Sequence, residues 1–480
     1  MQQDISPADL ARFSGELGSF PAYTVARNAA TSSGVRAAGR NPVVFRAYRD
    51  TYSVSLSPTG EVTNQRQSGR CWAFAAMNVL RDRMMSELGT KAFELSQAYV
   101  QFYDKLEKAN LFLSEVVRLA DEPIESRRNT LIFETPVPDG GWWDMAVALV
   151  EKYGVVPKAC MPDSANACAT SDMNELLYRR LRQDGLELRA AVAAGASDAE
   201  LDEKKRAFLS ETYRMLSVSL GEPPQTFDFD YVADARPEAK ADDAAKGDEG
   251  TPETLAAKKA KAAQDDRFVR LEGLTPLEFF HRFFHADLHD FVSLGNVPGE
   301  GRPFGSILQL QHAGSVAGVP IRMLNEPVEV LKDGVIAQLK AGHPAWFACD
   351  VTKLLDRTDK AGVLDPESVD AQALFGVEMS MDKAQSFDSR ETNLNHAMTF
   401  QGVNLTSAGT PTAWRVENSW GKERCHDGYF VMTDRYFDAY VGQVIVHNDY
   451  LPADIVAAWE SSDTPVVEMD PWSPMFGLSD

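Results

Sequence analysis

The chain is poor in cysteine and has no long apolar run. It contains five cysteines in 480 residues, and only Cys160 and Cys168 lie close together in the sequence. So few cysteines, odd in number, do not form a disulfide framework, which favours a reducing compartment. No apolar segment approaches the roughly 20 residues that a membrane-spanning helix needs. Residues 1–6 also lack the basic start and apolar core of a secretory signal, so we expect a cytoplasmic protein with no membrane partner.

Basic residues are scarce relative to acidic ones. The chain has 48 Lys and Arg against 70 Asp and Glu, which gives a net charge of -22. A charge of this sign repels nucleic acid, so we expect no nucleic-acid partner. It would suit a chamber that attracts cationic peptides, although a solvated acidic surface is the commoner explanation. The apolar fraction of 44% is ordinary for a globular protein, and a chain this long usually folds as more than one lobe.

Periodicity and composition divide the chain into five parts. The first half is rich in helical patterns and the second in short β-type runs, so the fold class is expected to be α+β. Strands are predicted around residues 328–330, 345–349, 397–400 and 429–432. The five predicted parts are an N-terminal arm that wraps the body (1–60, with a helix from Pro7 to Leu17), a helical lobe (61–160), a helical insertion (161–304, with a mobile low-complexity stretch at 236–266), a strand-rich lobe (305–450) and a C-terminal arm (451–480).

One cysteine, Cys71, lies where a helical pattern begins. Ser68 and Gly69 precede it and are residue types that cap a helix start. The N-terminal end of a helix favours negative charge, so the pattern predicts a lowered thiol pKa and a reactive thiolate. Gln65, six residues upstream, can direct an amide N–H at an oxyanion beside that sulfur. The apolar residues that follow form one predicted helical stripe: Ala73, Met77, Leu80, Met84 and Leu88.

A lone cysteine at a helix start is more often a buried apolar side chain than a nucleophile, so the interpretation depends on its companions. His396 precedes an apolar run, and Asn418 and Trp420 stand in the stretch Val416–Gly421. A cysteine nucleophile needs a base, and an Asn carbonyl can hold that base in one tautomer. Trp420 can shield the bond between His396 and Asn418 from water. The order Gln, Cys, His, Asn points to covalent catalysis.

Three histidines, His281, His285 and His289, are spaced by four after a helix start at Thr275. On one helix face they could bind a metal. No carboxylate or cysteine at ligand spacing completes the set. We therefore expect a structural or surface role for them, and neither a metal nor another cofactor.

The motifs together resemble the papain-like cysteine peptidases, and within them the bleomycin hydrolase/aminopeptidase C family. The resemblance runs from about residue 45 to the end of the chain, and Ser68 stands where secreted papain-like enzymes have a disulfide-bonded cysteine. The stretches that carry it are Ser68–Trp72, Lys152–Lys158, Thr275–Phe279, His396–Phe400 and Trp414–Gly421.

The resemblance implies a two-lobed papain-like fold with a catalytic cleft between the lobes. Cys71 would be the nucleophile, His396 the general acid and base, and Asn418 the residue that orients His396. Gln65 would donate to the oxyanion. Such enzymes act on peptides with a free N-terminus, and projecting insertions help them to form a homohexameric ring.

Four positions are expected to bind substrate: Gly140, Gly141, Trp420 and Asp480. The two glycines match a loop where papain-like enzymes bind substrate backbone, since glycine lets another chain approach closely, although they could equally form only a turn. Residues 470–480 resemble the C-terminal arm of the family, which lies in the cleft and meets the substrate's α-ammonium with its terminal carboxylate.

The arm departs from the family pattern. Ser473 replaces an Asp, Phe476 replaces a Gly, and Asp480 adds a second carboxylate at the end; Trp142 stands where relatives often have Gln. The expected function is a cysteine aminopeptidase. Two alternatives stay open: an endopeptidase of the same fold, if the arm does not reach the cleft, and a non-catalytic assembly that binds nucleic acid or unfolded chains.

Overall fold

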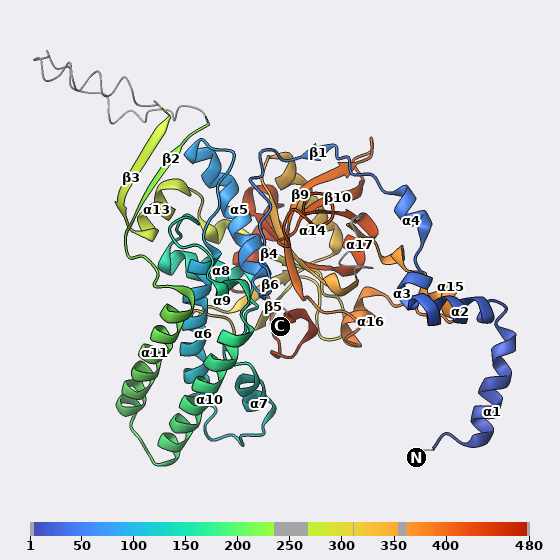
Figure 1. Ribbon diagram of the computed structural model, residues 1–480, viewed down its shortest axis with the longest axis horizontal. Coiled ribbons are helices and arrows are strands. Elements are labelled where there is room, and N and C mark those ends of the chain that lie inside the picture. Colours follow the sequence, from blue (N-terminus) through green and yellow to red (C-terminus); the bar gives the residue numbers. More distant parts are fainter. Residues whose placement is uncertain (1–3, 235–266, 311, 354–361, 478–480) are drawn as a thin grey trace, which may run out of the picture.

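The computed structural model describes residues 4–234, 267–310, 312–353 and 362–477. A group of helices occupies one side of the molecule and a large sheet the other, which confirms the α+β fold class (Figure 1). No helix among the described residues is long and apolar enough to cross a membrane. The helical part comprises α5 (Cys71–Leu88), α6 (Gln97–Arg118), α7 (Arg127–Glu134), α8 (Trp143–Tyr153), α9 (Ala165–Cys168), α10 (Ser171–Ala193), α11 (Asp198–Leu220) and α13 (Pro276–Phe283).

The described residues form one eleven-stranded sheet and a separate two-stranded one. In the large sheet β1 (Val54–Ser55) pairs with the central strand β9, and the small sheet is the hairpin of β2 (Phe227–Val232) and β3 (Phe268–Leu274). The order of the other ten strands is β13 (Val466–Glu468), β5 (Ser306–Leu310), β6 (Ile321–Asn325), β4 (Phe291–Gly295), β12 (Val441–His447), β7 (Ala345–Cys349), β9 (His396–Leu405), β10 (Pro411–Glu417), β11 (Tyr429–Thr433) and β8 (Val363–Leu364). The helices that pack around the sheet or follow its strands are α14 (Val328–Lys340), α15 (Ala371–Phe375), α16 (Lys383–Asp388), α17 (Asp434–Tyr440) and α18 (Ala453–Glu460).

Helix α5 is the central element between the two parts. The five residues of the predicted apolar stripe are all buried, which confirms the stripe, but burial extends beyond it: every residue from Cys71 to Arg81 is buried, so the first half of the helix is covered on all sides. Two side chains of the sheet donate hydrogen bonds to its carbonyls, Trp346 Nε1 to the oxygen of Trp72 (3.2 Å) and Thr399 Oγ1 to that of Ala75 (3.4 Å). These bonds fix the start of α5 against β7 and β9.

The segment 161–304 is not wholly helical as expected. It contains the long helices α10 and α11, but also the β2–β3 hairpin and strand β4. Strand β4 is fully buried and pairs with β12, so the sheet begins before residue 305. A run of apolar residues on a buried strand cannot be told from a helix by periodicity, which explains the error. The low-complexity stretch 236–266 lies outside the described residues.

One of the four predicted strands is wrong. Residues 328–330 open helix α14, whose Leu331, Val335 and Leu339 are spaced by four and buried. The alternation of Val328 and Val330 favoured a strand locally, but the longer helical period dominates. The other three runs lie in β7, β9 and β11, as predicted.

The N-terminal arm holds α1 (Pro7–Glu16), α2 (Tyr23–Ser33), α3 (Val35–Ala38) and α4 (Pro42–Ala47). The helix predicted from Pro7 is confirmed, and Ser6 and Asp9 cap it reciprocally. However, no residue of α1, α2 or α3 is buried, and these helices extend away from the body (Figure 1). The expectation that the arm wraps the body is therefore wrong for α1 to α3, whereas the rest of the arm does lie on the body: Val44 and Leu56 are buried, and β1 pairs with β9.

Candidate active site

Cys71 is the first residue of α5 and is 4% exposed. The residue that caps the helix is Arg70, and it makes no side-chain capping bond, so the predicted caps Ser68 and Gly69 do not act as such. Ser68 instead donates its hydroxyl hydrogen bond to the oxygen of Gln65 at 2.6 Å. Arg70 reaches sideways to Asp163 (3.1 Å), which holds the turn before the helix in place.

The environment of the thiol differs from the sequence-based expectation. Burial raises the pKa of Cys71 to about 11, although the backbone N–H groups of Ala397, Trp72 and Cys71 itself act to lower it. The helix end thus favours the thiolate, as predicted, but desolvation outweighs it. A second charged partner is needed for the thiolate to form at neutral pH.

His396 and Asn418 come from adjacent strands. His396 opens β9, and Asn418 follows the last residue of β10, which pairs with β9. Nε2 of His396 lies 2.9 Å from Oδ1 of Asn418. Because Ser419 N–H also donates to that oxygen (2.7 Å), the Asn carbonyl is an acceptor, and Nε2 of His396 carries the hydrogen. The other ring nitrogen is then the one that can exchange a proton.

Trp420 covers the imidazole. Its ring centroid lies 5.0 Å from that of His396, and it packs edge-on against Phe430. His396 and Asn418 are 4% and 2% exposed, so their hydrogen bond is shielded from water.

Gln65 reaches the site because its segment pairs with the strand end that carries Asn418. The Gln65 N–H donates to the oxygen of Ser419 (2.8 Å), and Ser419 Oγ donates to Oε1 of Gln65 (2.5 Å). One hydrogen of Gln65 Nε2 is held by the oxygen of Ser68 (2.6 Å). The second hydrogen of that nitrogen is available to an oxyanion. The sequence did not single out Ser419 as the residue that orients Gln65.

Gly140 and Gly141 lie next to the residue that follows the nucleophile. A Cβ atom on Gly141 would stand 2.4 Å from the Trp72 ring, so only glycine fits there. The indole N–H of Trp72 donates to the oxygen of Asp139 (2.9 Å), and the Gly69 N–H donates to the Asp139 carboxylate (3.1 Å). The glycine loop and the Cys71 turn are therefore joined directly.

The C-terminal arm is packed beside the same loop. Met475 and Phe476 are buried, and the Phe476 ring meets Trp142 edge-on at 5.5 Å. Leu394 lies two residues before His396, and its N–H donates to the oxygen of Pro474 in the arm (3.0 Å). Two departures from the family pattern, Trp142 and Phe476, thus contact each other. Asp480 lies outside the described residues.

Known proteins resemble this chain over almost its whole length. The model of the Peptidase C1-like family matches residues 4–245 and 256–476. The chain belongs to the Peptidase C1-like family. It is 37% identical to Aminopeptidase C of Lactobacillus delbrueckii subsp. lactis over 480 residues, which cover 100% of this chain and 99% of the relative. It is 36% identical to Aminopeptidase C of Listeria innocua, with both chains covered in full.

The fold comparison agrees. The crystal structure of PepW from Lactobacillus rhamnosis HN001 superposes with a TM-score of 0.88 at 37% identity, covering 99% of each chain. Membership of the Peptidase C1-like family and a papain-like two-part fold are thereby established for this chain.

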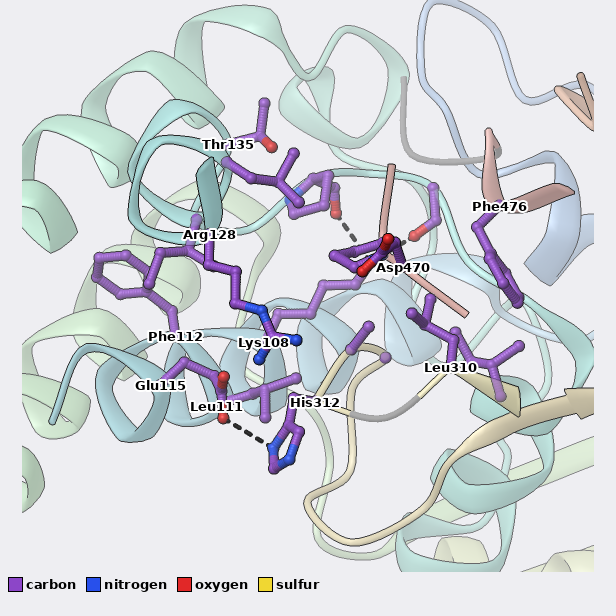
Figure 2. A pocket seen from close by; sticks show the side chains of 18 of the residues that line it. Lys108, Leu111, Phe112, Glu115, Arg128, Thr135, Leu310, His312, Asp470 and Phe476 are labelled. Carbon is purple, nitrogen blue, oxygen red and sulfur yellow. Dashed lines mark hydrogen bonds and ion pairs between the residues drawn. The ribbon is translucent and has the colours of Figure 1, made fainter. Parts of the chain in front are cut away.

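In this member of the Peptidase C1-like family a cavity of about 580 Å³ lies between α6, α7, the glycine loop and the C-terminal arm (Figure 2). Phe476, Gly140 and Gly141 line it, whereas Cys71 and His396 do not. Within the cavity wall Glu115 accepts from Arg118 and pairs with His312 Nδ1 at 3.1 Å, while the side chain of Arg128 points inward (Figure 2).

The three predicted helical histidines do not share a helix. Helix α13 ends at Phe283, so only His281 lies on it. His285 pairs with Glu87 (3.4 Å) and His289 with Glu151 (3.0 Å). Ligand atoms of Glu151, Asp287 and His289 lie within 4.8 Å of one another, so two carboxylates that sequence spacing did not reveal stand near one of the three histidines. All three side chains are exposed, and acidic surface groups often gather without a metal.

Proposed function

We propose that the protein is a cysteine aminopeptidase, in which Cys71 attacks the first peptide carbonyl of a substrate with a free N-terminus. The observation that carries the proposal is the hydrogen bond between His396 and Asn418 next to a buried thiol at a helix start, since the N–H of Ala397, the residue after His396, bonds to that thiol. The relatives named Aminopeptidase C support it over their whole length, and a relative from Lactobacillus delbrueckii subsp. lactis named Aminopeptidase G is 38% identical over 477 residues.

The chemistry proceeds by proton transfer within the buried site. The Cys71 thiol passes its proton to His396, and the thiolate–imidazolium pair stabilises both charges. The sulfur then attacks the carbonyl carbon. The oxyanion accepts hydrogen bonds from the backbone N–H of Cys71 and from Gln65 Nε2. His396 returns the proton to the leaving amine, and water hydrolyses the thioester with His396 as the base.

The C-terminal arm is proposed to limit the enzyme to free N-termini. Trp472, in the last ten residues of the arm, is held from two sides: the guanidinium of Arg127 lies over its ring (4.0 Å), and Arg390 donates to its carbonyl oxygen (2.8 Å). Its buried end at Phe476 lies against Trp142, one residue after the glycine loop. A chain so anchored occupies space that an internal peptide segment would need, and negative charge near its end attracts the α-ammonium group.

The backbone of Gly141 is proposed to bind an extended peptide. No hydrogen bond joins its N–H or C=O to another described residue. A free donor and acceptor on one residue is the pattern by which a strand edge takes up a further chain. Trp420 is assigned a shielding role beside His396 rather than a direct contact with substrate.

The test is hydrolysis of a fluorogenic aminoacyl amide with a free or an acetylated amine. The intact chain should cleave only the free amine, and a chain that lacks residues 476–480 should gain activity on the acetylated substrate. A chain that lacks only residues 478–480 is the matched control, because it keeps Phe476 and loses the Asp480 side chain, while its terminal carboxylate moves to Gly477. Equal cleavage of both substrates by the intact chain would contradict the proposal and support the endopeptidase alternative. The names of the relatives do not favour that alternative.

The non-catalytic alternative is also not favoured. The net charge of -22 opposes binding to nucleic acid, and the relatives bear the names of peptidases. Tight binding of a DNA or RNA oligonucleotide at low salt, weakening steeply as salt rises, would overturn this judgement.

A homohexamer and a cytoplasmic location complete the proposal. The N-terminal arm exposes large apolar side chains, among them Phe13 (44%) and Val25 (74%), and a hollow of about 590 Å³ separates it from α15. Such apolar surface on projecting helices suits contact with further copies. Light scattering should give six times the chain mass of 52.9 kDa, and removal of residues 1–33 should lower it. A monomeric full chain would contradict the assembly, and recovery outside the cytoplasmic fraction would contradict the location.

A further inference from the structure

Four consecutive carbonyl groups of the glycine loop each accept a hydrogen bond from a buried side chain. Lys105 Nζ donates to the oxygen of Val137 (2.5 Å) and Lys108 Nζ to that of Pro138 (2.8 Å). The indole N–H of Trp72 donates to the oxygen of Asp139, as described above, and Lys108 Nζ donates a second hydrogen bond to the oxygen of Gly140 (2.6 Å). The peptide planes that carry these four carbonyls cannot rotate without breaking the hydrogen bonds, three of which come from charged lysines.

Lys108 bonds the loop at two places, Pro138 and Gly140, one on each side of Asp139. Its ammonium group has three hydrogens, and all three are used, on Pro138, Gly140 and the Asp104 carboxylate (2.7 Å). The side chains of Lys108 and Asp104 are 4% and 2% exposed, so this pair lies in the interior of the helical part. A buried lysine is costly unless fully bonded, and here each of its bonds ends on the loop or on its counter-ion.

Lys105, one turn earlier on α6, holds the same loop at Val137 and also links it to the turn before Cys71. It pairs with the Asp139 carboxylate (2.6 Å), which in turn accepts the Gly69 N–H next to the Cys71 turn. Although burial opposes it, the Lys105 charge and hydrogen bonds from Thr170 and Asn174 hold the pKa of Asp139 well below its usual range. Lys105 therefore braces the nucleophile's turn, and Lys108 braces Gly140 and the residue after it.

We propose that Lys108 is a positioning residue that fixes the peptide plane of Gly140 and so holds the unpaired N–H and C=O of Gly141 in place for a peptide chain in the cleft. The inference rests on the proposed binding role of Gly141. Gly140 and Gly141 line the cavity beside Phe476, with Lys108 in the same wall (Figure 2). Lys108 touches no reacting atom. Its contribution is to substrate binding and not to the chemical step.

The test variant is Lys108→Met combined with Asp104→Asn, which removes the ammonium group without leaving a buried carboxylate unpaired. The control is Lys152→Met, because Lys152 also pairs with a buried acid, Glu107 (2.5 Å), but lies on α8 and donates no hydrogen bond to the loop. The double variant should raise KM for a free peptide about tenfold, the worth of one good hydrogen bond, with kcat within about twofold. The control should change neither constant.

A second readout separates positioning from general loosening of the site. Alkylation of Cys71 by iodoacetamide does not use Gly141, so its rate should stay unchanged in the double variant. Lys108→Gln keeps two of the three N–H donors without the charge and should give an intermediate KM; this variant decides the matter if the double variant fails to fold. An unchanged KM, or a fall in kcat accompanied by slower alkylation, would overturn the proposal. Failure of the wild-type chain to cleave peptides would instead overturn the proposed function.

Discussion

Arg81 and Glu417 form a buried ion pair that joins the nucleophile's helix to the strand before Asn418. Nη2 of Arg81 lies 2.6 Å from Oε1 of Glu417, and both side chains are at most 1% exposed. Asn78 and Gln401 donate to the same carboxylate, at 3.3 and 2.7 Å. Burial raises the pKa of Glu417, although the positive charge of Arg81 acts to lower it. The pair thus sets the position of Cys71 relative to His396 and Asn418 across the two parts of the fold.

Glu417→Gln should lower the free energy of unfolding by about 3 to 5 kcal/mol, since removal of one partner leaves the buried Arg81 charge uncompensated. Denaturation by urea measures this difference. The control is Glu175→Gln, which breaks the exposed pair of Glu175 and Arg179 and should change stability by less than about 1 kcal/mol. Equal effects of the two substitutions would show that the buried pair is not a structural link.

Cys71→Ala should abolish peptide turnover and leave the fold intact, because the change removes one sulfur from a buried site. Circular dichroism and the thermal midpoint should match the wild-type chain within a few degrees. Cys160→Ala, at a half-buried thiol near Asp228, should retain full activity. Residual turnover near wild type in Cys71→Ala would remove this residue from the mechanism.

His396→Ala should reduce kcat more than Asn418→Ala does. His396 transfers protons, whereas Asn418 holds the ring through one hydrogen bond of 2.9 Å and never exchanges a proton itself. Steady-state kinetics on one free peptide rank the two variants. The reverse order would refute the orienting role of Asn418.

The pH dependence of Cys71 alkylation should report its coupling to His396. Burial raises the thiol pKa to about 11 against the backbone N–H groups that lower it, and at that pKa only about one part in ten thousand of the thiol is thiolate at pH 7 unless His396 takes its proton. In His396→Gln the alkylation rate should therefore be low at pH 7 and rise with pH towards 11. In the wild-type chain proton transfer to His396 should give fast alkylation at pH 7. Identical pH profiles for the two chains would contradict the proposed ion pair.

The residues that carry the chemistry could be found from the sequence because each stands in a short motif. Cys71 follows Gln65 at a fixed spacing, and Asn418 is part of the Asn-Ser-Trp-Gly stretch. The strands near His396 and Tyr429 were also predictable, because their apolar runs end in turn residues. In these cases a few neighbouring residues are enough to identify the catalytic residue or the strand.

The supporting residues could not be found in this way. Lys105, Lys108 and Glu417 look like solvated charges in a sequence, and only the long-range packing of α6 and β10 makes them buried. Likewise the raised pKa of Cys71 depends on how completely the sheet and helices cover α5, which no local pattern shows. The contact of Phe476 with Trp142 joins positions more than 300 residues apart in the sequence.

The most direct test of the account is capture of the acyl-enzyme on Cys71. We expect Asn418→Ala to deacylate slowly, because His396 is the base of that step and Asn418 orients it. This variant is mixed with a free peptide, quenched in acid and digested, and the Cys71 fragment is weighed by mass spectrometry. A thioester should add the mass of the peptide's first residue alone to that fragment, and Cys71→Ala should show none. An adduct of several residues, an adduct on another side chain, or no adduct while turnover continues would contradict a cysteine aminopeptidase built on Cys71.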